Sequence, residues 1–416
     1  MDMKRLLSHP FVARYGLLLL LAAAVVPALV SLFYDAFRIH WCDWWPTYNY
    51  FIGYEYGFGS RKLIGTLVGP LLPEVVTAKH IRLLVLPANV LMLLGAVWFV
   101  WRCLRAGGRA AVPVAVLTAL YAVNPFSLTE WVTSSLSLGF METYQLVATL
   151  VWLLLFLRWR GRWWYYVATL LVTTACCLVH HTFCCTLLPL YTALFVYDTL
   201  QDGRLHRGKA IAYGSMLALL LVLFVLLWRC SGMNIDMETL YSRIDGRANQ
   251  DVLPDRDGLR MLYYLSNSDN ASGRTFDHQR DLRFAIELLF MLPLLAILVC
   301  PWVVAARRAP AGAARWRYRL VPAIALLMTV PVFFMATDYT RWWTCWTFTL
   351  ATLPLAAFAT GDTLFRQALL QLGGFLRRHW WLPPLLAAYL VQFHLDLFEG
   401  MVESARLIDT VSTFLH

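Results

Sequence analysis

Asp338 and Arg341 stand three residues apart at the junction of two long apolar runs, 320–336 and 344–360, neither of which contains a charged residue. On a helical turn, positions i and i+3 share a face, so these two side chains can pair or can hold a polar ligand together. Trp342, which follows Arg341, offers a ring on which a sugar can stack. The same pattern also fits an ion pair at a helix end beside an interfacial Trp anchor, and the motif alone leaves both interpretations open.

A second candidate cluster lies soon after the first apolar run. Three glycines precede Arg61 and Lys62, which gives a backbone that can bring N–H groups close to an anion, with two cations beside it. Such a patch suits the diphosphate of a lipid carrier. Asp35 and Asp43 add two acids to the same segment, 35–82. The alternative is an aromatic belt whose basic residues meet lipid headgroups.

Three further residues could move a proton. Glu142 lies at the mouth of an apolar run, where apolar surroundings would raise the pKa of its carboxyl group and suit it to general base catalysis. As an acid in a first helical turn, it is also favoured by the helix dipole alone. His180 and His181 form the tip of an apolar hairpin, where neutral imidazoles can bind hydroxyl groups or shuttle protons, although both also fit a simple turn.

The cysteines around these histidines resemble a metal site only superficially. Cys176, Cys177, Cys184 and Cys185 flank His180 and His181, but they have no fixed zinc-type spacing, and adjacent helical residues point about 100° apart. We interpret them as small apolar fillers and predict no metal ligands. We also predict no soluble cofactor, while the need for a divalent metal stays open.

The composition decides which elements must position these residues. The chain of 416 residues is 60% hydrophobic and 14% charged, which is typical of a multi-pass membrane protein. We predict a single all-α transmembrane domain over 1–416, with about eleven transmembrane helices. The predicted spans are 15–34, 83–101, 110–123, 143–157, 164–180, 182–197, 210–228, 284–304, 320–337, 344–360 and 380–396.

Lys and Arg predict the orientation. Each predicted inner segment holds three or more of them, whereas 124–142 holds none and 338–343 holds only Arg341. The positive-inside rule therefore predicts a cytoplasmic N-terminus and an extracytoplasmic C-terminus. The basic inner segments are 4–14, 102–109, 158–162, 204–209, 307–319 and 366–378.

Two long segments are then extracytoplasmic: 35–82 and 229–283. The second is predicted to carry an amphipathic helix at 258–265 and to lie over the outer openings of the bundle. The net charge of +10 is mainly a topology signal, so we predict no nucleic-acid partner. The chain contains no nucleotide-binding motif, which argues against a cytoplasmic reaction driven by a nucleotide.

The chain resembles the bacterial polytopic polysaccharide polymerases and GT-C-like glycosyltransferases, the Wzy/EpsG-like group. The features that carry the resemblance are an acid after the first span (Asp35 or Asp43), the stretch from Gly57 to Gly65 around Arg61, an outer His with a Pro in the next span (His180 or His181, then Pro189), a long outer loop, and the late Asp338-x-x-Arg341-Trp342 motif. Thr182 follows His181 where this pattern has an acid, so the identity of the base stays open.

The resemblance implies a GT-C-like bundle in the bacterial cytoplasmic membrane. It implies transfer or polymerisation of saccharide units from a polyprenyl-diphosphate-linked donor to an acceptor hydroxyl at the outer face. Arg61, Lys62 and Arg341 would hold the diphosphate, and Glu142 or Asp338, with His180 or His181, would take the proton. The implied partners are the lipid-linked saccharide, membrane lipids and envelope-polysaccharide assembly proteins.

Two other functions fit a multi-pass membrane protein. A flippase or transporter of lipid-linked saccharides would use charges at mid-span and internal repeats, but the predicted spans are nearly free of charge at their centres and the two halves show no convincing similarity. An outer-leaflet acyltransferase would use His180 or His181, but it needs an acyl donor that the sequence does not identify.

Overall fold

The computed structural model describes residues 47–105, 107–133, 140–249, 278–335, 339–391, 393–395 and 402–404, together with 26, 28–30, 33, 259, 260 and 263. Almost all of the regular structure in these residues is helical. The helices are α4 (Lys62–Val68), α5 (Ala78–Leu104), α6 (Ala111–Ala122), α7 (Leu128–Thr133), α8 (Met141–Trp159), α9 (Trp163–Val179), α10 (Phe183–Thr186), α11 (Leu188–Thr199), α12 (Arg207–Arg229), α13 (Met237–Asp245), α15 (His278–Arg308), α16 (Ala313–Leu327), α17 (Val330–Met335), α18 (Tyr339–Ala359), α19 (Thr363–Arg378) and α20 (Leu382–Val391). Short 3-10 turns are η1 (Tyr48–Tyr50), η2 (Tyr54–Tyr56), η3 (Gly69–Leu71) and η5 (Gln201–Gly203), and β1 (Phe393–Leu395) pairs antiparallel with β2 (Val402–Ser404).

The described residues contain five helices long and apolar enough to cross a membrane, or six if one bent pair counts as a single span. Such helices suit a bilayer because they satisfy their backbone hydrogen bonds internally. The chain is therefore a multi-pass helical membrane protein, as the composition predicts. The five stretches are Ala78–Leu104, Met141–Trp159, Arg207–Arg229, Glu287–Arg308 and Ala313–Phe334.

Other predicted spans correspond to shorter elements. The runs at 110–123, 164–180 and 380–396 form α6, α9 and α20, which have only 12, 17 and 10 residues. The total of about eleven spans includes these helices and the run at 15–34, so it stays a prediction. Of that first run the structure describes 26, 28–30 and 33, all helical.

The predicted span 182–197 is broken in two. It forms α10 and α11, which are separated at Leu187. Pro189 is the second residue of α11 and lacks the N–H that would bond to the carbonyl of Cys185, which weakens a continuous helix at this point. The break shortens the element that follows the two histidines.

A sharp elbow joins α18 to α19. Their axes are bent by 117°, and Gly361 at the turn has φ +81°, a conformation that favours glycine. Asp362 caps α19 by accepting a hydrogen bond from the backbone N–H of Phe365. The buried residues of α19 recur at helical spacing along one face, so the helix lies against the bundle. They are Phe365, Ala368, Leu369, Leu372 and Leu376.

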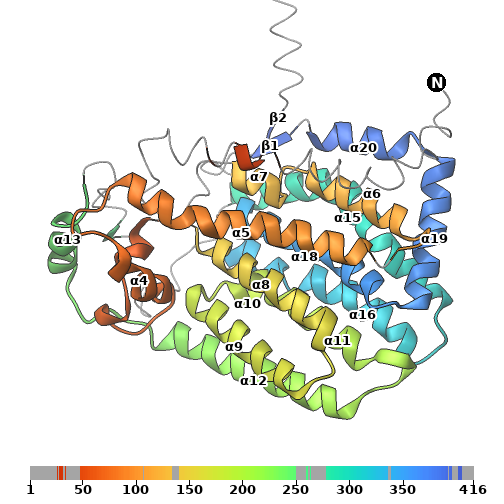
Figure 1. Ribbon diagram of the computed structural model, residues 1–416, viewed down its shortest axis with the longest axis horizontal. Coiled ribbons are helices and arrows are strands. Elements are labelled where there is room, and N and C mark those ends of the chain that lie inside the picture. The colour runs from red at the N-terminus through yellow and green to blue at the C-terminus, as the bar shows by residue number, and fades with distance from the viewer. Residues whose placement is uncertain are drawn as a thin grey trace, which may run out of the picture.

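The residues 47–77 and 230–249 pack together at one end of the bundle, and we call them the α4 cap. The backbone N–H of Gly232 donates to the carbonyl of Phe58 at 2.9 Å, and Val76 forms a parallel bridge with Ala248. The two segments predicted to be extracytoplasmic therefore contact each other. In Figure 1, α4 and α13 of this cap lie at the left-hand end of the molecule and α19 lies at the right-hand end.

Within the second of these segments, helix α13 was not predicted. Asp236 caps it by accepting from the N–H of Thr239, and Leu240 and Ile244 bury its apolar side. The pattern Met237, Leu240, Tyr241, Ile244 is amphipathic and could have revealed it. Of the helix predicted at 258–265, the structure describes 259, 260 and 263, which are helical.

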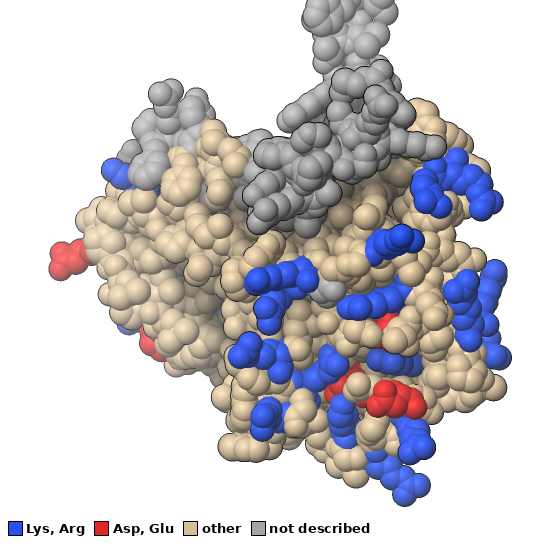
Figure 2. Space-filling view, turned by 45° about the vertical axis from the view of Figure 1, so that its right-hand side comes forward, with Lys and Arg blue, Asp and Glu red and all other residues tan. Residues whose placement is uncertain are grey.

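The opposite end, which we call the basic end, gathers exposed arginines, and Figure 2 shows many Lys and Arg side chains on this part of the surface. Helix α5 begins next to the α4 cap and reaches this end after 27 residues, about 40 Å at 1.5 Å per residue. The arginines come from loops that are distant in sequence. They are Arg102, Arg105, Arg109, Arg158, Arg162, Arg204, Arg207, Arg307, Arg308, Arg319, Arg377 and Arg378.

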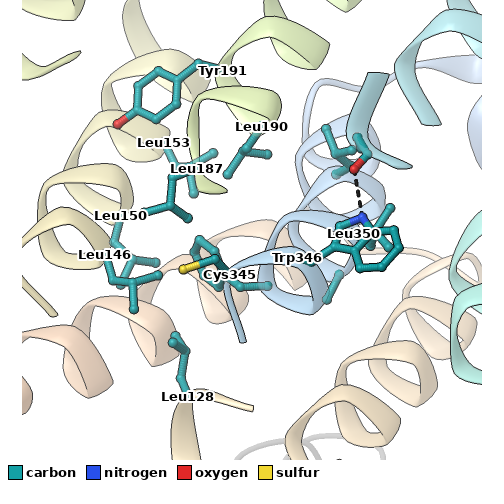
Figure 3. Packing of buried hydrophobic residues seen from close by; sticks show 14 of the residues in the cluster. Leu128, Leu146, Leu150, Leu153, Leu187, Leu190, Tyr191, Cys345, Trp346 and Leu350 are labelled. Carbon is teal, nitrogen blue, oxygen red and sulfur yellow. Dashed lines mark hydrogen bonds between the residues drawn. The ribbon is translucent and has the colours of Figure 1, made fainter. Parts of the chain in front are cut away.

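A buried apolar cluster holds α8, α11 and α18 together (Figure 3). Leu146 and Leu150 of α8 and Cys345 of α18 are almost fully buried in it. Trp346 also donates from its indole Nε1 to the carbonyl of Ala325 at 2.8 Å, which ties α18 to α16. Because Glu142 and Arg341 each lie one turn before this cluster, the packing fixes the first turns of α8 and α18 relative to each other.

Candidate functional site

Arg341 and Glu142 form a buried ion pair near the α4 cap. The Nη1 atom of Arg341 lies 3.3 Å from both carboxylate oxygens of Glu142, and the two side chains are 4% and 0% exposed. The guanidinium also lies over the rings of Phe140 and Trp342, 4.6 and 4.9 Å from their centroids. A charge in an apolar interior needs such partners, so this contact joins two residues 199 positions apart in the sequence.

Arg61 and His180 form a second contact. The Arg61 Nε–H donates to Nε2 of His180 at 3.0 Å. Nδ1 of the same ring accepts from the backbone N–H of Thr182 at 3.1 Å and lies 2.8 Å from the Thr182 hydroxyl, so both ring nitrogens are engaged. This contact joins the N-cap residue of α4 to the C-cap residue of α9. Arg61 itself has φ +70°, a left-handed conformation that is uncommon for residues other than glycine.

Gln145 connects the two contacts. It lies one turn after Glu142 on α8, and its side-chain Nε2 donates to the carbonyls of Cys176 and His180 at 2.9 and 2.8 Å. These two bonds hold the end of α9 against the first turn of α8. Sequence reasoning missed Gln145, although a polar residue three positions after Glu142 in an apolar run was a usable signal.

His181 faces the α4 cap. Its backbone N–H donates to the hydroxyl of Ser60 at 3.0 Å, and its buried Nδ1 has no hydrogen-bond partner in the described part of the chain. Burial, and to a lesser extent the charge of Arg61, lower the pKa of His181 to about 4. His181 is therefore neutral at pH 7.

Lys62 forms its hydrogen bonds within the α4 cap. Its ammonium donates to the carbonyls of Gly232, Tyr56 and Phe58 at 2.9, 3.4 and 3.4 Å, and the side chain is 1% exposed. Burial lowers the pKa of Lys62 to about 8, although the charge of Glu55 opposes this. All three N–H groups are directed at backbone carbonyls, so Lys62 ties the two cap segments together.

Three other predicted site residues, Asp35, Asp43 and Asp338, lie outside the described residues. Trp342 is described and 1% exposed, with its ring against Arg341. Sequence reasoning also missed Glu287, a buried acid of α15 that accepts a hydrogen bond from the indole of Trp343. A lone acid inside the apolar run 284–304 was the signal that could have found it.

A second set of buried charges lies at the basic end. Asp198 contacts Lys209 at 2.8 Å and Arg160 at 3.5 Å. Asp362 contacts Arg317 at 3.1 Å. Tyrosine hydroxyls complete both groups: Tyr213 donates to Asp198, and Tyr197 and Tyr318 donate to Asp362.

The Arg61–His180 and Arg341–Glu142 pairs lie near the α4 cap and combine two guanidinium groups with a buried carboxylate and a neutral imidazole. Such a set of groups can bind an anion and accept a proton.

In the described residues, no group of three or more His, Cys, Asp or Glu side chains is placed to hold a metal ion. Comparison with protein-family models, curated proteins and solved structures found no match.

Proposed function

We propose that the protein transfers or polymerises saccharide units from a polyprenyl-diphosphate-linked donor to an acceptor hydroxyl at the extracytoplasmic face of the bacterial cytoplasmic membrane. The observation that carries this proposal is the placement of Arg61 with His180 and of Arg341 with Glu142 at the end of the bundle opposite the basic end. The positive-inside rule assigns the arginine-rich end to the cytoplasm, so the other end meets substrates of the outer leaflet.

Arg61 and Arg341 are the groups proposed to hold the diphosphate. Each presents a planar fork of N–H donors, which fits two oxygens of one phosphate. In the transfer step the acceptor oxygen bonds to C1 of the donor sugar, and the bond from C1 to the diphosphate oxygen breaks. The diphosphate leaves with the bonding electrons, and the two guanidinium groups stabilise its added charge.

Glu142 is the base proposed to take the proton of the acceptor hydroxyl. A carboxylate has about four lone-pair positions, and within the described residues Glu142 accepts only from Arg341 Nη1. Both ring nitrogens of His180 are already engaged, Nε2 by the Nε–H of Arg61 and Nδ1 by the backbone N–H and hydroxyl of Thr182. We therefore assign His180 to positioning Arg61. Trp342, beside Arg341, offers an aromatic surface for a sugar ring.

The direct test uses purified protein in proteoliposomes with a radiolabelled undecaprenyl-diphosphate saccharide. We expect a longer lipid-linked saccharide as product, together with release of undecaprenyl diphosphate. Arg102→Ala, at an exposed arginine of the basic end, is the matched control and should retain full transfer. Movement of the labelled lipid between leaflets without any new glycosidic bond would overturn the proposal and identify a flippase.

A further inference from the structure

Cys177 and Cys184 face each other across the turn that carries the two histidines. Cys177 lies in the last turn of α9 and Cys184 in α10, and their Sγ atoms are 3.7 Å apart. No step of the proposed transfer uses either thiol. The residues between them, 178–183, include His180 and His181.

The turn between the two cysteines is tightly bonded. The backbone N–H of His180 donates to the carbonyl of Cys176 at 3.1 Å, and that of Cys184 donates to the carbonyl of His181 at 3.1 Å. The backbone therefore holds the two thiols in the same relative position. A disulfide requires an Sγ–Sγ distance of about 2.05 Å, so side-chain rotation must bring the sulfurs about 1.7 Å closer.

The two thiols differ in accessibility. Cys177 is fully buried, whereas Cys184 is partly exposed. Cys184 is therefore the more accessible thiol of the pair, and Cys177 is the neighbouring thiol that completes the exchange. This arrangement of an accessible thiol beside a buried one is what sequential thiol–disulfide exchange needs.

We propose that Cys177 and Cys184 are a redox pair that forms a reversible disulfide across the His180–His181 turn. The sulfur of Cys184, having lost its proton, attacks a disulfide-bearing oxidant and releases one thiol. The sulfur of Cys177, also deprotonated, then displaces the second thiol and closes the protein disulfide. The two cysteines lose two electrons and two protons, and the oxidant is reduced to two thiols.

The bond would link the end of α9 to α10 around the turn that presents Nε2 of His180 to Arg61. It would therefore restrict how far the Arg61–His180 contact can open, and it places a redox-sensitive connection directly at the candidate site. The assignment of Cys177 and Cys184 does not depend on which reaction the site performs. It departs from the sequence-based interpretation of Cys177 and Cys184 as apolar fillers.

The test is chemical and uses the folded, full-length protein. Purified protein is incubated with glutathione disulfide, free thiols are then alkylated after unfolding in SDS, and peptides are analysed by mass spectrometry without reduction. We expect most of the protein to carry a Cys177–Cys184 crosslink that dithiothreitol removes. Exposed Cys230 reports that the oxidant is active by forming a mixed disulfide with glutathione.

Serine variants assign the crosslink. It should persist in the Cys176→Ser/Cys185→Ser double variant and disappear in Cys177→Ser and in Cys184→Ser, with all variants eluting as wild type in gel filtration. The proposal is overturned if Cys177 and Cys184 stay fully alkylated while Cys230 is glutathionylated. A crosslink that needs Cys176 or Cys185 would also overturn it.

Discussion

The two ends of the bundle bury carboxylates in different ways. At the basic end, Asp362 accepts from Arg317, from two tyrosine hydroxyls and from the backbone N–H of Phe365. Near the α4 cap, Glu142 accepts from a single nitrogen of Arg341, at 3.3 Å to each oxygen. A carboxylate with every lone pair engaged stabilises a fold, whereas one with open lone pairs can still receive a proton.

The helices around the two carboxylates also differ. Asp362 caps α19 at the elbow after α18, so its bonds fix the course of the chain. Glu142 and Arg341 occupy the first turns of two helices that a shared apolar cluster already holds in place. Their ion pair therefore joins two helices that are already packed together and does not set the course of the chain.

Glu142→Gln should give the largest effect and tests the catalytic side of the contrast. The amide keeps the shape of the side chain but cannot accept the acceptor's proton, so saccharide transfer should fall about 10²–10⁴-fold. The measurement is single-turnover transfer per folded molecule in proteoliposomes, with Arg102→Ala as control. Transfer within twofold of wild type would remove Glu142 as the base.

Asp362→Ala tests the structural side. Loss of this carboxylate leaves Arg317 buried without its counter-charge, so the free energy of unfolding should fall by about 3–5 kcal/mol. Transfer per folded molecule should be unchanged. Thermal unfolding in detergent measures the first quantity, and Arg378→Ala, at an exposed arginine of the same helix, is the matched control. A large loss of specific transfer activity would contradict the division between the two ends.

Arg341→Lys keeps the positive charge but removes the planar guanidinium group, so it tests whether two directed N–H donors are needed at this position. A single ammonium cannot reproduce bidentate bonds to a phosphate, so transfer should fall about 10–100-fold, equivalent to one charge-assisted hydrogen bond of about 1.5–3 kcal/mol. Initial rates over a range of donor concentrations check this. Equal rates for Arg341→Lys and wild type would mean that a point charge suffices at this position.

Lys62→Met should give the smallest effect, and a pH-dependent one. The folded-state pKa of Lys62 is lowered from 10.5 to about 8, so between these pH values the unfolded chain binds more protons than the folded chain. The stability of wild type relative to Lys62→Met should therefore rise as pH increases from 8 to 10.5. Unfolding temperatures of both proteins across this range test it, and parallel curves would contradict it.

The sequence alone determined the class of protein. Long apolar runs and a low charge content dictate membrane helices, because a bilayer excludes unpaired backbone polar groups. The clustering of arginines in alternate loops also predicted a basic end, and α5, α8 and α12 matched predicted runs within a few residues. These properties are local, so they can be read without knowing which helices pack together. The break at Leu187 escaped prediction because hydropathy does not register the missing N–H of Pro189.

The tertiary structure alone decided which charges meet. The sequence offered Asp338, a near neighbour that lies outside the described residues, as a partner of Arg341, and it gave no sign of the contact with Glu142 on α8. Lys62 was expected on a diphosphate together with Arg61, yet burial directs its ammonium to carbonyls of the cap and leaves Arg61 on His180. Such pairings depend on how α4, α8, α9 and α18 pack against one another in space, and this packing arises from contacts between residues that are tens to hundreds of positions apart.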